Sequence, residues 1–172
     1  AEQLGLKMKP WNKKTNGKAF ICLQNTKSLL WQGNPPPNAW IQSFMPALEE
    51  EGLEVIIRPH PRDPFHLSPL LDGRVTVQAP KMTGVDETDF DNALENASLV
   101  ITHLSNTGVQ AVMNGIKTVA SRTSWALPIA SPNVGRHRSL IDQPLDRQLS
   151  SMPNRRTWLE RLSHTEWLVN EI

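Results

Sequence analysis

Short apolar runs with polar borders recur along this chain, and each run has the length of one β-strand. The first of them is apolar at every position, as expected of a strand that is covered on both faces. The pattern predicts five strands, over residues 19–23, 54–58, 74–77, 99–101 and 118–120.

Between these runs, apolar residues recur at the spacing of one helix face. Asn38 is in position to cap a helix that runs to about residue 50 and ends at Gly52, while Pro46 kinks this helix or starts it afresh. Further helices are predicted over residues 64–71, over 89–97, after Gly108, and from about 154 to 172. Strands that alternate with helices in this way predict βαβ units. The expected fold class is therefore α/β, with a Rossmann-like parallel sheet of about five strands flanked by helices.

A polar loop follows the strand predicted at 99–101 and leads directly into a helix. A helix N-terminus offers unpaired N–H groups and the positive end of a dipole, so this loop is a natural seat for phosphate. The loop also has a purely structural interpretation, because Ser, Asn and Thr are ordinary capping residues and Gly108 permits close packing of helix on sheet. Gln110 follows closely enough to reach a sugar hydroxyl.

A second polar cluster, Arg58-Pro-His-Pro-Arg62, follows the strand predicted at 54–58. Its two prolines end the strand and leave Arg58, His60 and Arg62 at its carboxyl end. Arginine suits charge-assisted binding of phosphate, although surface arginines and strand-ending prolines are also ordinary structure. In a parallel sheet both clusters reach the carboxyl edge, where ligands bind at the switch point of the strand order. We therefore expect one shared site.

Composition and charge narrow the classes of function. The chain has 172 residues and a formal net charge of +1, so it suits one domain without a general attraction to nucleic acid or membrane. One cysteine allows no intramolecular disulfide, and neither a signal peptide nor a long apolar run is present, which predicts a soluble protein of a reducing compartment such as the cytoplasm. No metal-ligand spacing is found, so neither a metal nor a resident cofactor is expected.

The distribution of charge divides the chain into a short N-terminal segment and one domain. Residues 1–18 form a basic segment, which we expect to be solvated, and residues 19–172 form the Rossmann-like domain. Residues 24–37 form a loop rich in proline that is long enough to serve as a flap. The acidic residues Asp86, Glu87, Asp89 and Asp91 suit the N-terminus of a helix.

The two polar clusters also carry a resemblance to a known family. Arg58-Pro-His-Pro, followed by Val100-Ile-Thr-His-Leu-Ser-Asn-Thr-Gly-Val-Gln-Ala-Val-Met-Asn-Gly-Ile, resembles the donor-binding half of GT-B glycosyltransferases. The capsular-polysaccharide type and short proteins encoded by tailed phages are the most similar. The end of the chain, with Trp158-Leu and Glu166-Trp167, resembles the tail of those phage proteins. The resemblance covers roughly residues 19–172.

This resemblance implies a single GT-B half-domain that binds a nucleotide-sugar and transfers the sugar, without a metal, to a saccharide or a modified DNA base. Its implied binding residues are Arg58, His60, Arg62, His103, Ser105, Asn106, Thr107, Gly108 and Gln110. His60 and His103 are the candidates for catalysis. Many members of the family have glutamate where this chain has Gln110, so a carboxylate for the ribose is in question.

The acceptor-binding half of a GT-B enzyme has no room in 172 residues. A homo-oligomer or a partner chain supplies that half, the chain is a fragment, or the protein no longer catalyses. The alternative function is a non-catalytic Rossmann-like binding or scaffold module that acts with a partner chain.

Overall fold

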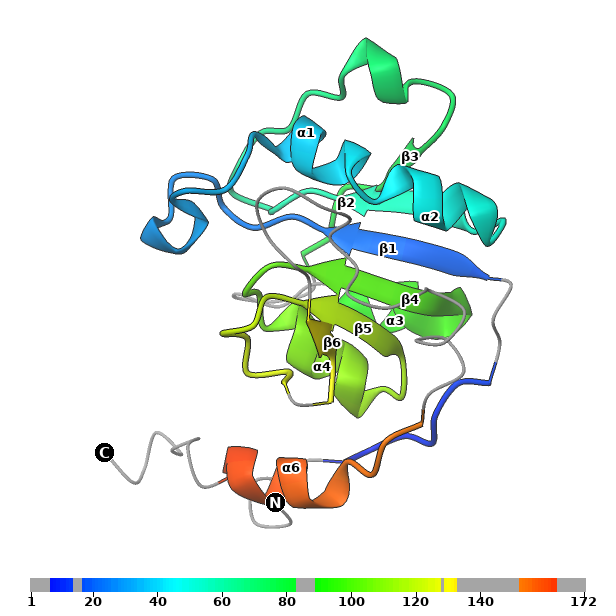
Figure 1. The fold of residues 1–172 in the computed structure, drawn as a ribbon, viewed down its shortest axis with the longest axis vertical. Helices are drawn as coiled ribbons and strands as arrows, with labels where there is room; N and C mark the ends of the chain where they lie inside the picture. Colours follow the sequence, from blue (N-terminus) through cyan, green and yellow to red (C-terminus); the bar gives the residue numbers. More distant parts are fainter. Residues whose placement is uncertain (1–6, 14–16, 83–88, 128, 133–151, 164–172) are drawn as a thin grey trace.

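The computed structural model describes residues 7–13, 17–82, 89–127, 129–132 and 152–163. Six parallel strands form one sheet in the order β3-β2-β1-β4-β5-β6 (Figure 1). This is the strand order of a Rossmann-like sheet, and the order reverses between β1 and β4. The strands are β1 (Lys18–Cys22), β2 (Glu54–Arg58), β3 (Thr76–Val77), β4 (Ala97–Thr102), β5 (Lys117–Ala120) and β6 (Ser131–Pro132).

The strand pattern confirms the predicted α/β class and the parallel sheet. Each of the five predicted strands is present, although β3 is reduced to Thr76–Val77, and both of its residues are exposed. The sixth strand, β6, falls in a stretch that we expected to be irregular. Its two residues, Ser131 and Pro132, contain no apolar run that could have indicated a strand.

One face of the sheet is covered by α1 (Pro37–Gln42) and α2 (Met45–Glu50), as Figure 1 shows. Of the two alternatives predicted at Pro46, the fresh start is confirmed, because Pro46 lies in the first turn of a second helix. The prediction that Asn38 caps the first helix is wrong. Pro36 occupies the cap position, and the Asn38 side chain bonds instead to the backbone of His66 and Ser68.

The other face is covered by α3 (Phe90–Ala93), the 3₁₀ turn η3 (Leu94–Asn96) and α4 (Thr107–Met113). Alternate residues of the central strands pack on opposite faces, as the two-residue period of a strand requires. In β1, Ile21 belongs to the core under α1 and α2, whereas Phe20 and Cys22 belong to the core under α3 and α4. The helix predicted over 64–71 is only a 3₁₀ turn, η2 (Pro69–Leu71).

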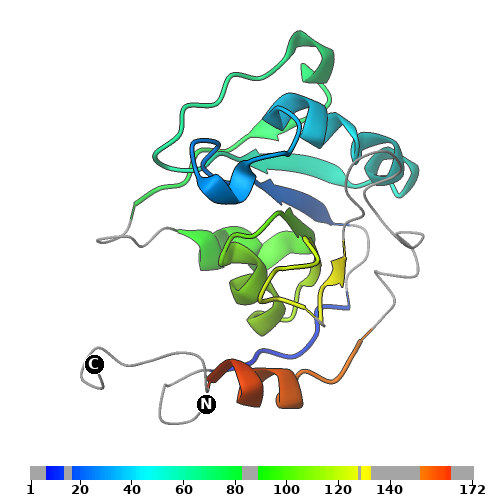
Figure 2. The same ribbon diagram turned by 60° about the vertical axis from the view of Figure 1, so that its left-hand side comes forward.

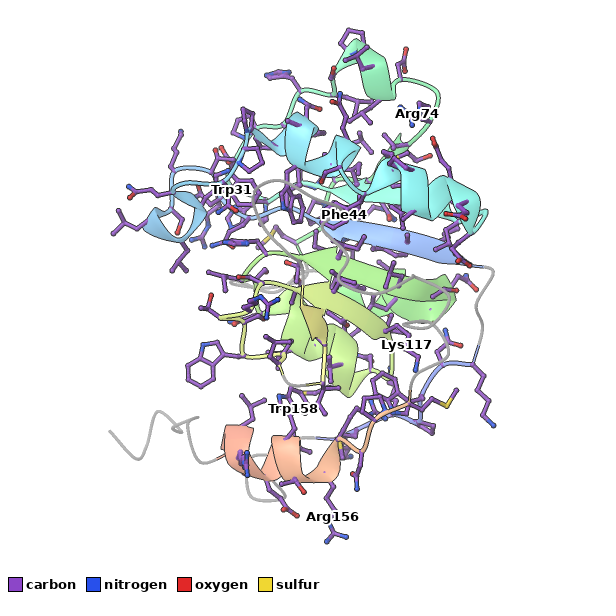
Figure 3. All side chains as sticks on the ribbon, in the orientation of Figure 1. Trp31, Phe44, Arg74, Lys117, Arg156 and Trp158 are labelled. Carbon is purple, nitrogen blue, oxygen red and sulfur yellow. The ribbon has the colours of Figure 1, made fainter. Side chains whose placement is uncertain are left out.

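The two ends of the described chain meet beyond β5, next to α6 (Arg156–Ser163), which Figure 2 shows in orange. Trp11 Nε1 donates to Pro153 O at 3.0 Å, and its ring contacts two cations, Lys117 Nζ and the Arg155 guanidinium. These lie 4.3 and 4.2 Å from the ring centroid, and Figure 3 labels Lys117. The expectation of a solvated basic segment is therefore wrong for Trp11.

The C-terminal helix was predicted to continue to residue 172. The structure describes it as α6, where Trp158, Leu159 and Leu162 are buried as the pattern indicated. Trp167 and Leu168 lie outside the described residues. Within the described part of the chain, no helix combines the length and the apolar character needed to cross a membrane.

Candidate functional site

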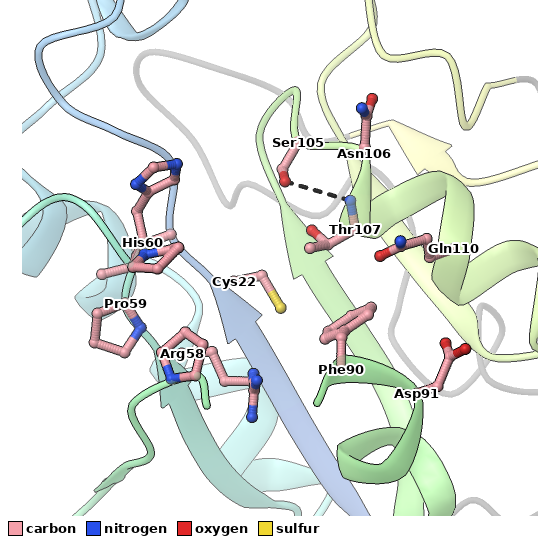
Figure 4. A pocket seen from close by; sticks show the side chains of 13 residues that line it. Cys22, Arg58, Pro59, His60, Phe90, Asp91, Ser105, Asn106, Thr107 and Gln110 are labelled. Carbon is pink, nitrogen blue, oxygen red and sulfur yellow. Dashed lines mark hydrogen bonds between the residues drawn. The ribbon is translucent and has the colours of Figure 1, made fainter. Parts of the chain in front are cut away.

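A pocket of about 570 Å³ opens at the carboxyl ends of β1, β2 and β4, where the strand order reverses (Figure 4). Ligands of open parallel sheets bind at this position, because the loops that leave neighbouring strands diverge there. The pocket brings together the two polar clusters that the sequence pointed to. Its lining residues are Cys22, Leu23, Arg58, Pro59, His60, Pro61, Pro80, Phe90, Asp91, Ser105, Asn106, Thr107 and Gln110.

Arg58 is the last residue of β2, and its side chain is only 3% exposed. Its Nη2 donates to Asp89 Oδ1 at 2.5 Å, and its guanidinium carbon lies 5.8 Å from the centre of the Phe90 ring. Nη1 is buried and has no hydrogen-bond partner among the described residues. A buried charged donor without a partner is costly, so Arg58 has the capacity to bind an anion in the pocket.

Asp89 is the partner that the sequence analysis missed. Burial raises the pKa of its carboxyl, but the hydrogen bonds from Arg58 and from the Lys81 backbone N–H, together with the positive charge of Arg58, lower it by more, so the pKa ends below its ordinary value. Asp89 is therefore ionised at neutral pH. It lies in the acidic cluster that had been interpreted as a helix start, and no local pattern distinguished it from its acidic neighbours.

His60 stands on the loop after β2, between two prolines, and lines the pocket beside Arg58. Its Nδ1 accepts the backbone N–H of Arg62 at 3.1 Å, which fixes the orientation of the ring. In the neutral form the proton therefore lies on Nε2, which makes that atom a donor. Arg62 itself is exposed and is not among the pocket-lining residues.

The loop from Ser105 to Thr107 contributes hydroxyls rather than the open amides that the sequence suggested. The Thr107 N–H donates to Ser105 Oγ at 3.3 Å, and the Gly108 N–H donates to Ser105 O at 3.0 Å. The helix that follows has only seven residues. The expectation of unpaired N–H groups at this helix start is therefore wrong for Thr107 and Gly108, and the polar side chains remain as possible ligand contacts.

Gly108 is outside the pocket lining and has a packing role. A Cβ at this position would lie 3.0 Å from Cγ2 of Thr102 and 3.5 Å from Cβ of Ala126. Such a contact is tighter than ordinary van der Waals packing, so glycine lets α4 lie close to β4. This is the structural interpretation that the sequence left open for this residue.

His103 faces away from the pocket lining, toward the loop that follows β1. Its Nε2 lies 3.1 Å from Leu30 O and 3.2 Å from Asn34 Nδ2, and its ring packs edge-on against Trp31. Burial lowers the pKa of His103, and the Leu30 carbonyl opposes this effect only in part. The structure thus separates His103 from His60, so the two candidate catalytic histidines do not share one pocket.

The loop predicted as a flap over residues 24–37 includes the 3₁₀ turn η1 (Leu29–Trp31), and its last residue, Pro37, is the first residue of α1. The beginning of the loop is anchored on both neighbouring strand ends. Thr26 donates through its N–H and its hydroxyl to Asp63 Oδ2, both at 2.7 Å, and Gln24 Oε1 accepts the Leu104 N–H at 3.2 Å. These contacts connect the loop to the β2 and β4 loops, both of which contribute to the pocket.

The floor of the pocket includes Cys22 at the end of β1, which is 3% exposed. Burial raises the pKa of this thiol to about 12, so it stays protonated and acts as an apolar surface. Phe90 adds an aromatic ring to the same pocket. No group of three or more potential ligands among the described residues could hold a metal ion.

No protein-family model and no curated protein matches the chain. Among solved structures, the chain is similar to KpsC of Thermosulfurimonas dismutans, a beta Kdo 2,4 transferase, at 17% sequence identity and a TM-score of 0.43. The match covers 83% of this chain and 47% of that chain, so this chain spans about half the length of the structure that it matches. At this identity and TM-score the similarity concerns only the path of the backbone. The function proposed for this chain rests on its own residues.

Proposed function

We propose that the pocket binds a nucleotide-sugar and that the chain is a metal-independent glycosyltransferase-like protein, which transfers the sugar to a saccharide or a modified DNA base. The observation that carries this proposal is the buried Nη1 of Arg58, which has no hydrogen-bond partner among the described residues and belongs to a residue that lines the pocket. A phosphate oxygen would supply the missing acceptor, and guanidinium–phosphate pairs are among the strong hydrogen bonds of proteins.

The remaining lining residues suit the same ligand. His60 adds a donor next to Arg58, and the Ser105 hydroxyl adds another on the opposite loop, whereas the Thr107 hydroxyl donates to Thr102 Oγ1 at 3.5 Å. Cys22 and Phe90, with three prolines, give the pocket an apolar component on which a base or a sugar ring can pack. The pocket therefore combines anion-binding and apolar surfaces in a volume of about 570 Å³.

In sugar transfer, the bond between the anomeric carbon and the phosphate oxygen that carries the sugar breaks, and its electron pair leaves with the nucleotide, which is a nucleoside diphosphate for UDP- and GDP-sugars and CMP for a CMP-sugar. The acceptor oxygen forms the new bond to the anomeric carbon and loses its proton to a base. Arg58 and His60 would stabilise the negative charge that develops on the departing diphosphate. A fixed guanidinium and a fixed N–H donor do the work that a divalent cation does elsewhere, so we expect activity to be insensitive to EDTA.

Calorimetry with UDP-, GDP- and CMP-sugars tests the proposal. We expect one class to bind, and Arg58→Ala to weaken its binding by about 1.5–3 kcal/mol, the value of a hydrogen bond to a charged group. Arg58→Lys, which keeps the positive charge beside Asp89, covers the case in which the alanine variant does not fold. Arg74→Ala is the matched control, because Arg74 forms an exposed ion pair with Glu49 outside the pocket.

The assay also separates transfer from binding alone. Release of free sugar, or its transfer to glycan or DNA acceptors, supports the enzyme, whereas binding without release is the result expected of the binding-module alternative. A wild-type protein that binds no nucleotide-sugar contradicts the proposal and leaves the scaffold module that acts with a partner chain. The homo-oligomer or partner chain expected from the sequence stays a prediction, which light scattering with and without the ligand tests.

A further inference from the structure

The pocket has two sides of opposite electrostatic character. Figure 4 shows Arg58 and His60 on one side and Gln110 and Asp91 on the other. The first side carries positive charge and hydrogen-bond donors. The second side carries a carboxylate beside an amide, so it repels phosphate and accepts hydrogen bonds from neutral donors. A ligand with a phosphate at one end and hydroxyls at the other is therefore oriented by the different hydrogen-bonding groups of the two sides.

The carboxylate of Asp91 is held in place by a residue of the neighbouring helix. Asn114 Nδ2 donates to Asp91 Oδ1 at 3.0 Å and to Gln110 O at 2.9 Å. The first of these bonds joins α3 to the C-terminal end of α4, and the second lies within α4 and fixes the Asn114 side chain. A carboxylate accepts about four hydrogen bonds, so Asp91 keeps capacity for a ligand after this contact.

We propose that Asp91 is a specificity-determining residue that accepts hydrogen bonds from a vicinal diol of the bound ligand. This inference rests on the proposed function, and it adds which part of the ligand lies where. The diphosphate lies toward Arg58 and His60, and the diol lies toward Asp91 and Gln110. The carboxylate on this side of the pocket is that of Asp91 in α3. The pocket therefore has a carboxylate for the diol although residue 110 is a glutamine.

A vicinal diol fits this position better than a single hydroxyl does. Its two O–H donors can reach a carboxylate together, and the adjacent Gln110 amide can act as donor or acceptor to either oxygen. A ligand that lacks one hydroxyl leaves part of this polar wall without a partner, which costs affinity. The two sources of such a diol are the ribose of the nucleotide and the transferred sugar.

The test is calorimetry of wild type and Asp91→Asn with UDP, GDP, ADP and CDP, each beside its 2′-deoxy form. We expect wild type to bind the ribo-form about tenfold more tightly, and Asp91→Asn, which keeps the size of the side chain, to lose most of that preference. A second arm compares UDP-glucose with UDP-2-deoxyglucose. Glu95→Gln is the control, because Glu95 is an exposed acid in the adjoining η3 turn that does not line the pocket.

If wild type prefers the ribonucleotide to its 2′-deoxy form and Asp91→Asn loses this preference, the diol is that of the ribose. If a preference is found only between UDP-glucose and UDP-2-deoxyglucose, the diol is that of the transferred sugar. Equal affinity for both forms in both arms, or a preference that Asp91→Asn leaves unchanged, overturns the role of Asp91. In that case ligand binding itself still supports the proposed function. If none of these nucleotides binds to wild type, the proposed function fails, and the role of Asp91 fails with it.

Discussion

Replacing Asp89 by Asn removes the negative partner of a buried arginine while keeping the size of the side chain. Arg58 is 3% exposed and Asp89 is 18% exposed, and the 2.5 Å contact between them is the ion pair that neutralises Arg58. Without Asp89, the guanidinium stays charged because arginine does not deprotonate in proteins. Asp89→Asn therefore leaves an uncompensated charge next to the core.

The expected loss follows from the burial of the pair. Removing one partner of a buried ion pair costs about 3–5 kcal/mol, and the partial exposure of Asp89 places this case near the lower end, at about 3 kcal/mol. For a chain of this length, 1 kcal/mol shifts Tm by about 2–4 °C, so Tm should fall by about 6–12 °C.

Thermal unfolding of Asp89→Asn and Glu49→Gln, each beside wild type, measures this difference. Glu49 pairs with Arg74, but these side chains are 47% and 42% exposed, and such pairs contribute about 0–1 kcal/mol. Glu49→Gln should thus lower Tm by less than about 4 °C. Equal losses in the two variants would refute the assignment of Asp89 as the neutralising partner of a buried charge.

Three other predictions concern the rest of the fold. Burial lowers the pKa of His103 in the folded state. As the pH falls below about 6.5, His103 therefore binds a proton in the unfolded state more readily than in the folded state. The free energy of unfolding in urea should therefore fall below that pH, and His103→Gln should flatten the dependence. Burial and the charge of Arg155 lower the pKa of Lys117 to about 8, so stability should rise with pH between about 8 and 10.5, and Lys117→Met should abolish this rise. Gly115→Ala, with φ +77° and Pro10 O within 1.9 Å of the added Cβ, should cost clearly more in urea unfolding than Gly52→Ala, with φ +64° and open space, which costs about 1–2 kcal/mol. Equal costs for these two variants would argue against docking of residues 7–13 on the domain.

The strands were predictable because their pattern is local. β2 matches its predicted bounds, and alternate residues of β1 pack on opposite faces, as the apolar run over residues 19–23 indicated. The meeting of Arg58 and Ser105 in one pocket was predictable too, because parallel strands bring their carboxyl ends to one edge.

The polar partners were not predictable, because they depend on contacts between distant segments. Asp89 lies 31 positions after Arg58, and no sequence pattern distinguishes it from the other acidic residues at the predicted helix start. His103 sits beside the pocket loop in the sequence, but its ring turns to Leu30, 73 positions away. Trp11 contacts Pro153 across 142 positions, and no periodicity records such a pairing.

A crystal structure of the chain with the nucleotide-sugar that binds to it tests the central claim most directly. We expect a phosphate oxygen within hydrogen-bond distance of Arg58 Nη1, the diphosphate between His60 and the Ser105–Thr107 loop, and the Arg58–Asp89 pair still in place. A ligand bound elsewhere, or bound in this pocket with Nη1 of Arg58 still lacking an acceptor, would contradict the account.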